Sequence, residues 1–170
     1  MRQTGPRLLI YGVLVAFAVA VIAFGFASHS NKGELAHPLP HQVLVGPAVT
    51  LAGLRGKPVF VVFWASWCGP CQKEAPALER FANNLRGRAT LVGVNWNDPL
   101  LGNARSFIRR YRWSFPNLRD GEGLVGDDYG LSGLPMTFLI DSTGHVRQSL
   151  GGAQNQQTLE RALSELKSAA

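Results

Sequence analysis

The stretch Trp67-Cys68-Gly69-Pro70-Cys71 holds both cysteines of this 170-residue chain and lies where a strand is expected to lead into a helix. Before it, residues 59–64 form a continuous β-branched and aromatic run, which is typical of a strand buried on both faces. After it, residues 70–86 are expected to be helical. Two residues separate the thiols, so Cys68 can be exposed at the helix N-terminus with Cys71 one turn further on, close enough for a disulfide. The stretch therefore predicts a two-electron redox switch.

The start of a helix gives the two thiols different properties. Unpaired backbone N–H groups and the positive end of the helix dipole favour the thiolate of Cys68. Pro70 suits the first helical turn, where its missing N–H group is not needed. We therefore expect Cys68 to be the nucleophile and Cys71 to be the resolving thiol.

Two other interpretations of the cysteine pair are weaker. A closed zinc site needs four ligands, and the chain has no second cysteine pair. Its histidines are scattered: three lie in a polar segment and one in a predicted turn, at His29, His37, His41 and His145. A purely structural disulfide would stabilise little, because the entropy gain grows with the number of residues enclosed. We expect neither a metal nor a cofactor at this site.

Residues 63–71 resemble the active-site segment of thioredoxin-fold proteins. The following Gln72-Lys73-Glu74-Ala75-Pro76 is similar to the extracytoplasmic TlpA/ResA/DsbE (CcmG) branch of that superfamily. Three more segments are similar to the same branch: residues 53–57, 93–95 and 133–141. The resemblance covers residues 44–168 and implies a membrane-anchored thiol-disulfide oxidoreductase that needs no cofactor.

The resemblance also implies a role for Glu74, three residues after Cys71. In this interpretation the carboxyl tunes thiol ionisation or relays protons; the alternative is an ordinary surface glutamate. Val62 departs from the family pattern, because many relatives have aspartate or asparagine at this position. No carboxylate can act from Val62, which favours Glu74.

Leu134-Pro135 resembles the cis-proline loop of the family, which lies beside the cysteines and offers the backbone of the residue before the proline to an extended substrate. Without the resemblance, the segment would be a turn that leads into a strand. Together with Leu134 and Pro135, the expected substrate-binding residues are Trp67, Gly69 and Pro70. Relatives specialised for cytochrome c maturation often have glutamate after this proline. Here the residue is Met136, which weakens that assignment.

The sequence thus predicts an enzyme that reduces disulfides of exported proteins, such as apocytochrome c, through a mixed disulfide on Cys68 that Cys71 resolves. A thiol oxidase or disulfide isomerase of exported proteins is the second interpretation, and a non-catalytic membrane-tethered binding module is the third. A peroxidase is disfavoured because there is no separate peroxidatic cysteine. The expected partners are protein thiols and disulfides and a membrane electron donor of thiol-disulfide type. Nothing in the sequence indicates nucleic-acid binding, and we expect a monomer.

The N-terminal part of the chain predicts a membrane anchor. Residues 8–27 contain no charge over twenty residues, enough for a helix to cross the bilayer core. Arg2 and Arg7 before this run place the N-terminus in the cytoplasm. A cleaved signal peptide is the alternative, although its apolar region is usually shorter. Both interpretations place the domain outside the cytoplasm, after a linker expected at residues 28–46.

Residues 47–170 are expected to form one α/β domain. Its predicted strands cover residues 59–64, 89–95, 136–141 and 145–150, and its predicted helices cover residues 70–86, 100–112 and 155–168. Strands that alternate with helices indicate a parallel core, and the turn at residues 142–144 adds an antiparallel pair. The fold class is therefore a thioredoxin-like three-layer sandwich with a mixed central sheet, preceded by one transmembrane helix.

The net charge of +6 is dispersed except for four arginines in the predicted helix at residues 100–112. Helical spacing groups Arg105, Arg109 and Arg112, with Arg110 beside them. Such a cluster is either a docking face for an acidic partner or anionic lipid, or a solvated helix surface. The solvated surface is favoured, because charge clusters of this kind are common on exposed helix faces.

Overall fold

The computed structural model describes residues 33–168. The expected transmembrane segment, residues 8–27, and the first residues of the expected linker lie outside this range. Within it, none of the helices combines the length and hydropathy needed to cross a membrane. The first half of the domain contains β1 (Gln42–Val45), η1 (Ala52–Leu54), β2 (Val59–Trp64), α2 (Gly69–Leu85), β3 (Thr90–Trp96) and α3 (Leu101–Tyr111). The second half contains β4 (Asn117–Asp120), α4 (Leu124–Asp128), β5 (Met136–Ile140), β6 (Val146–Gly151) and α5 (Gln156–Ser168).

The strands form one six-stranded mixed sheet in the order β1-β4-β3-β2-β5-β6. Strands β2, β3 and β4 are parallel to one another, whereas β1, β5 and β6 each run antiparallel to their neighbour towards the centre. The predicted parallel core and the antiparallel β5–β6 pair are confirmed, and so is the mixed α/β sheet.

Strand β2 lies in the middle of the sheet because every one of its side chains is apolar and buried. Alternate residues point to opposite faces of a strand. On one face, Phe60, Val62 and Trp64 pack in the core formed with α2, α3 and α5. On the other face, Val59, Val61 and Phe63 pack with residues that include Leu39 and Tyr129. A continuous apolar run is therefore required, since both faces of the sheet are covered.

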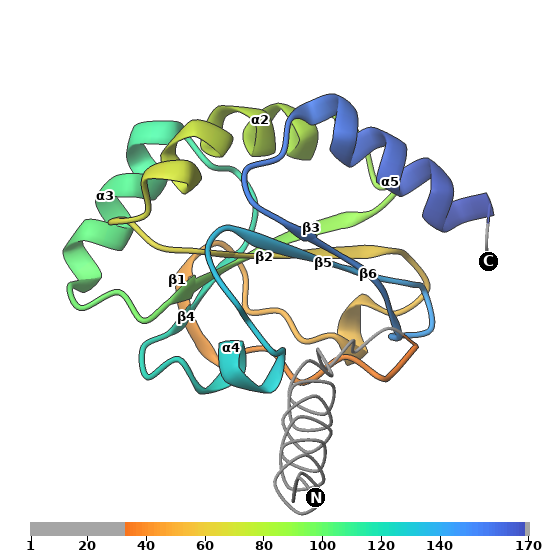
Figure 1. Ribbon diagram of the computed structural model, residues 1–170, viewed down its shortest axis with the longest axis horizontal. Helices are drawn as coiled ribbons and strands as arrows, with labels where there is room; N and C mark the ends of the chain where they lie inside the picture. Colours follow the sequence, from red (N-terminus) through yellow and green to blue (C-terminus); the bar gives the residue numbers. More distant parts are fainter. Residues whose placement is uncertain (1–32, 169–170) are drawn as a thin grey trace, which may run out of the picture. The chain divides into compact units, whose positions relative to one another are not determined.

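Figure 1 shows the resulting layers within residues 33–168. Helices α2, α3 and α5 lie side by side over one face of the sheet, and α4, η1 and the chain before β2 lie against the other face. Helix α2 begins directly after β2 and continues through Pro76 to Leu85. The N-terminus of α2, where the cysteines lie, is therefore at the end of the central strand.

The structure corrects the expected linker at residues 28–46. Strand β1 pairs with β4, Leu39 is buried in the core, and Leu35 forms a bridge with His145. The folded unit thus includes residues before position 47, because the apolar side chains of this proline-containing segment cover one face of the sheet. Strand β4 and helix α4 were also missed; both are short, and β4 has polar residues at each end.

Candidate active site

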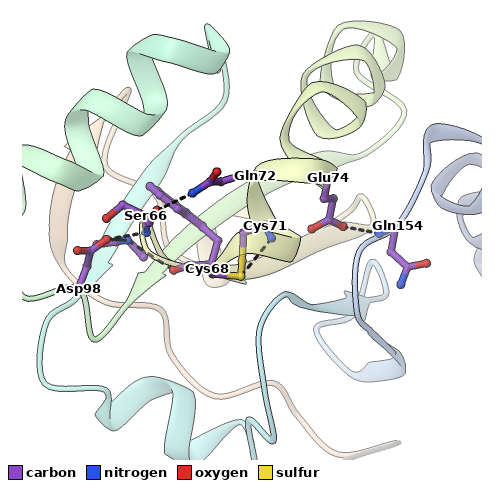
Figure 2. The surroundings of a disulfide bond; sticks show 9 residues. Ser66, Cys68, Cys71, Gln72, Glu74, Asp98 and Gln154 are labelled. Atoms are coloured by element: carbon purple, nitrogen blue, oxygen red, sulfur yellow. Dashed lines mark hydrogen bonds between the residues drawn. A yellow bond between two sulfur atoms is a disulfide. The ribbon is translucent and has the colours of Figure 1, made fainter.

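Cys68 and Cys71 are joined by a disulfide at the N-terminus of α2, with 5.2 Å between their Cα atoms (Figure 2). Cys68 is the N-cap residue, and its Sγ accepts a hydrogen bond of 3.1 Å from the backbone N–H of Cys71. Pro70 lies in the first helical turn, as expected. The helix therefore directs the Cys71 N–H group, which has no partner within the helix, and its positive dipole end at the sulfur of Cys68.

The expected exposure of Cys68 is wrong for this disulfide state. Its exposed fraction is only 4%, against 1% for Cys71. The bond to Cys71 and the hydrogen bond from the Cys71 amide hold the Cys68 sulfur close to the helix end. The neighbouring residues remain open: Trp67 is 55% exposed, and Gly69 and Pro70 are also exposed. A second protein can therefore reach the disulfide across these three residues.

A buried carboxylate, which was not predicted from the sequence, holds the turn before Cys68. Asp98 Oδ2 accepts a hydrogen bond of 2.7 Å from the backbone N–H of Ser66 and one of 3.1 Å from Asn95 Nδ2. Asp98 follows β3 and Ser66 follows β2, and these parallel strands are neighbours. Because the carboxyl ends of parallel strands meet at one edge of a sheet, polar residues after both strands were the signal that could have revealed this contact.

We expect Asp98→Ala to lower the free energy of unfolding by about 2 kcal/mol, because the amide groups of Ser66 and Asn95 lose their acceptor inside the protein. Urea unfolding of the oxidised protein measures this change. Asp98→Asn is the matched control, since its amide oxygen can still accept from Ser66, and it should recover most of the loss. If Asp98→Ala unfolds at the wild-type urea concentration, the carboxylate does not hold the turn.

Glu74 is buried, with an exposed fraction of 1%, so the alternative of a surface glutamate is wrong. Its Oε1 accepts a hydrogen bond of 3.0 Å from the backbone N–H of Gln154, and its Oε2 makes no hydrogen bond with any described residue. Burial raises the pKa of Glu74 to about 7, although the hydrogen bond from Gln154 opposes the rise. Figure 2 shows Glu74 and Gln154 on one side of the disulfide, with Ser66 and Asp98 on the other.

The peptide bond between Leu134 and Pro135 is cis, as the resemblance implied. Leu134 is partly buried and packs against both core clusters, and the carbonyl of Pro135 accepts a hydrogen bond of 2.9 Å from the Gly152 amide. Strand β5 begins at Met136 and pairs with β2, whose C-terminal end leads to the cysteines. The loop is therefore anchored at the sheet edge from which α2 starts.

Comparisons with known proteins agree with this geometry. Residues 36–149 match the model of the AhpC/TSA family. The chain belongs to the AhpC/TSA family of thioredoxin-fold proteins. It is 34% identical over 171 residues to the thiol-disulfide oxidoreductase ResA of Geobacillus thermodenitrificans, covering 95% of this chain and 97% of ResA.

Two solved structures are similar to this AhpC/TSA-family chain. One, from Chlorobium tepidum, is described as a thiol:disulfide interchange protein DsbE; it has a TM-score of 0.70 and 30% identity and covers 81% of this chain and 96% of its own. The other is a secreted disulfide oxidoreductase of Mycobacterium tuberculosis homologous to DsbE of E. coli. Its TM-score is 0.67 at 27% identity, with 77% of this chain and 96% of its own covered.

This AhpC/TSA-family protein is therefore a thiol-disulfide oxidoreductase of the TlpA/ResA/DsbE type. The chain departs from the family pattern at Val62, which lies in the core of the domain. Val62 is fully buried on the face of β2 that packs against the helices, and Thr137 lies opposite it on β5. Neither residue carries a carboxyl group, so Glu74 is the buried acid on the helix that carries the cysteines.

Proposed function

We propose that the reduced protein donates two electrons to disulfides of exported proteins, with Cys68 as the nucleophile and Cys71 as the resolving thiol. The observation that carries the proposal is the position of Cys68 as N-cap of α2, where its sulfur accepts the Cys71 amide. This environment stabilises a thiolate. Cys71 is more deeply buried and lies inside the first turn, which suits a thiol that reacts only with Cys68.

The electrons and protons balance in two steps. The Cys68 thiolate attacks one sulfur of the client disulfide, which breaks that bond, forms a mixed disulfide and releases the first client thiolate. Cys71 then loses its proton and attacks the sulfur of Cys68. This second step forms the Cys68–Cys71 disulfide and releases the second client thiolate, so the client is reduced and the enzyme is oxidised.

Glu74 is proposed to take up the proton that Cys71 loses. It lies one turn after Cys71 in α2, and burial raises its pKa to about 7, so it can exchange a proton near neutral pH. Its Oε2, which has no hydrogen-bond partner among the described residues, is the atom that can hold this proton.

We expect oxidised wild-type protein to lose about 3 kcal/mol of unfolding free energy, relative to Glu74→Gln, between pH 4.5 and pH 8. The folded-state pKa of Glu74, about 7, lies above its ordinary value of 4.5. Its stabilising contribution is therefore complete below pH 4.5 and is lost as the pH rises through 7. Urea unfolding across this range measures both proteins. Parallel stability curves would show that Glu74 does not titrate in this window.

The proposed client contacts are Trp67, Gly69, Pro70, Leu134 and Pro135. The first three residues are exposed around the cysteines, and the loop of the last two is anchored at the same edge of the sheet. The likeness to ResA and DsbE supports protein thiols and disulfides as clients. Apocytochrome c is the proposed client class, together with other exported proteins that carry a disulfide.

The proposed location is the outer face of the cell membrane, with residues 8–27 as the anchor and a membrane thiol-disulfide protein as the electron donor. The uncharged run of twenty residues and the description of a similar structure as a secreted protein support this location. The protein is proposed to act as a monomer.

Extraction with carbonate should leave the full chain in the membrane fraction, and quantitative release would indicate a cleaved signal instead.

Reduction of insulin by the full chain, with dithiothreitol as the electron source, tests the proposed enzyme. Multiple turnovers per molecule are expected. A non-catalytic binding module would not accelerate the reaction above the rate of dithiothreitol alone. Clients are then identified on a Cys71→Ser variant, because a mixed disulfide on Cys68 cannot be resolved in the absence of the second thiol.

A further inference from the structure

A polar groove of about 310 Å³ lies beside the disulfide, between the active-site segment and α3. Its lining comes from two parts of the chain: Ser66, Trp67 and Gln72 on either side of the cysteines, and Asn103, Ser106, Phe107 and Arg110 on α3. Figure 2 shows Ser66 and Gln72 on the side of the disulfide away from Glu74 and Gln154. The groove is therefore separate from the buried carboxyl that the proposed chemistry uses.

The groove is close enough to Cys68 to contact a client during the reaction. Trp67, the residue before Cys68, lines it and is 55% exposed. A client joined to Cys68 by a mixed disulfide extends by roughly 3.3 Å per residue, so a few residues beside its cysteine span the groove. Side chains in the groove can thus contact the sequence around the reacting cysteine.

The polar residues on the α3 side of the groove share one chemical property. Asn103, Ser106 and Arg110 are spaced three and four residues apart, which places them on one face of α3. All three are exposed and present hydrogen-bond donors. Among the described residues that line the groove none is acidic, and α3 itself contains no aspartate or glutamate.

Arg110 differs from the other arginines of α3 in its position. Helical spacing places Arg105 on the opposite side of the helix from Asn103 and Arg110, whereas Arg109 donates a 2.8 Å hydrogen bond to the Ser106 hydroxyl. Arg110 lines the groove itself. A guanidinium group recognises carboxylates through two parallel hydrogen bonds, and neighbouring positive charge strengthens this attraction.

We propose that this groove binds an acidic stretch of the client polypeptide beside its reacting cysteine, with Arg110 pairing with a client carboxylate. The inference rests on the proposed function, because the client must first react at Cys68. It adds a preference: among clients with the same disulfide, those with aspartate or glutamate next to the cysteine are reduced fastest. The solvated-surface interpretation of the arginine cluster then holds for Arg105 but not for Arg110.

The test uses three synthetic peptides with the same internal disulfide, flanked by two glutamates, two serines or two lysines. The reduced full chain is mixed with each peptide at low ionic strength, and the rate constant of disulfide exchange is measured. We expect the glutamate peptide to react about tenfold faster than the serine peptide, and the lysine peptide to react more slowly than both. The preference should decrease at 0.5 M salt, because surface charges are then screened.

Single substitutions distinguish binding in the groove from an effect of the protein's net charge. Arg110→Gln should reduce the ratio of glutamate to serine rates to about one, and Arg110→Glu should make the lysine peptide the fastest. Arg105→Gln, on the other face of α3, and Arg161→Gln, on α5, remove the same charge and should retain the wild-type ratio. Because these arginines are exposed, the changes are compatible with the fold.

The peptide experiment distinguishes a failure of the proposed function from a failure of the groove proposal. If the serine peptide is not reduced by the wild-type protein, the proposed function fails. If all three peptides are reduced at equal rates, the oxidoreductase activity is confirmed but the proposed preference for acidic clients is wrong. Equal rates would be expected, for example, if α3 faced lipid. If Arg105→Gln changes the ratio as much as Arg110→Gln, the preference comes from net charge and the groove proposal is also overturned.

Discussion

Cys68→Ser is expected to lower the rate of insulin reduction at least about 10³-fold, because the covalent path through a mixed disulfide no longer exists. Serine retains the size and the N-cap position of Cys68, where its hydroxyl can accept the Cys71 amide. The loss therefore reports on the missing sulfur and not on a damaged helix start. Turbidity of the precipitating insulin chains gives the rate, and circular dichroism verifies the fold.

Cys71→Ser is the matched control for this experiment. It should also lose turnover, but it should form a stable mixed disulfide with a client at Cys68, which mass spectrometry locates. The Cys68→Ser variant should form far less adduct, because Cys71 is the more buried of the two thiols and lies within the helix. A faster adduct on Cys71 than on Cys68 would reverse the proposed roles.

Gly93→Ala is expected to destabilise the protein by about 3–5 kcal/mol. Gly93 lies on β3 next to β2 and β4, and an added methyl group would overlap the side-chain amide of Asn117. Asn117 is fully buried and accepts a 3.1 Å hydrogen bond from the indole of Trp64. The methyl group thus adds the cost of overpacking to the loss of a buried hydrogen bond. Urea unfolding measures the total loss of unfolding free energy.

Gly102→Ala provides the control for Gly93→Ala. A methyl group at Gly102, in α3, meets no atom of the described residues within 4 Å. Alanine has the higher helix propensity, so this change should stabilise the protein by up to about 1 kcal/mol. Equal effects of the two substitutions would show that the contact between Gly93 and Asn117 is not tight.

The central strands and the large helices could be predicted because their signals are local. The apolar run at residues 59–64 is β2 at the same bounds, and α2 and α5 lie within one residue of their expected limits. A strand that is covered on both faces must be apolar throughout, and a helix that packs against a sheet must have an apolar face. These requirements are visible in the order of the residues.

Strand β4 could not be predicted, since its polar residues are buried by contacts far along the chain. Asn117 is satisfied by Trp64 and by the carbonyl of Phe115, and Asp120 accepts the Gly126 amide at 2.8 Å. Composition alone places such residues in a loop. Strand β1 was missed for a related reason: it is four residues long and lies in a proline-containing segment, and it pairs with β4.

The candidate active site, like the fold, could be predicted from the sequence only in part. The cysteines follow from a motif, and the resemblance led to Leu134, Pro135 and Glu74. The burial of Glu74 depends on the loop that carries Gln154, eighty residues away along the chain. Helical spacing grouped Arg105 with Arg109 and Arg112, but the position of Arg110 in the groove depends on how α3 packs beside Trp67. Such relationships exist only after folding.

The direction of electron flow is the central claim, and the redox potential of the Cys68–Cys71 pair tests it most directly. The Gly69-Pro70 pair between the cysteines resembles that of reducing thioredoxins, so equilibration with glutathione should give a potential of about −270 mV. Trapping of thiols in intact cells should then find the pair mainly reduced. A potential above about −180 mV, with a mainly oxidised pair in cells, would contradict the account and indicate an oxidase or isomerase.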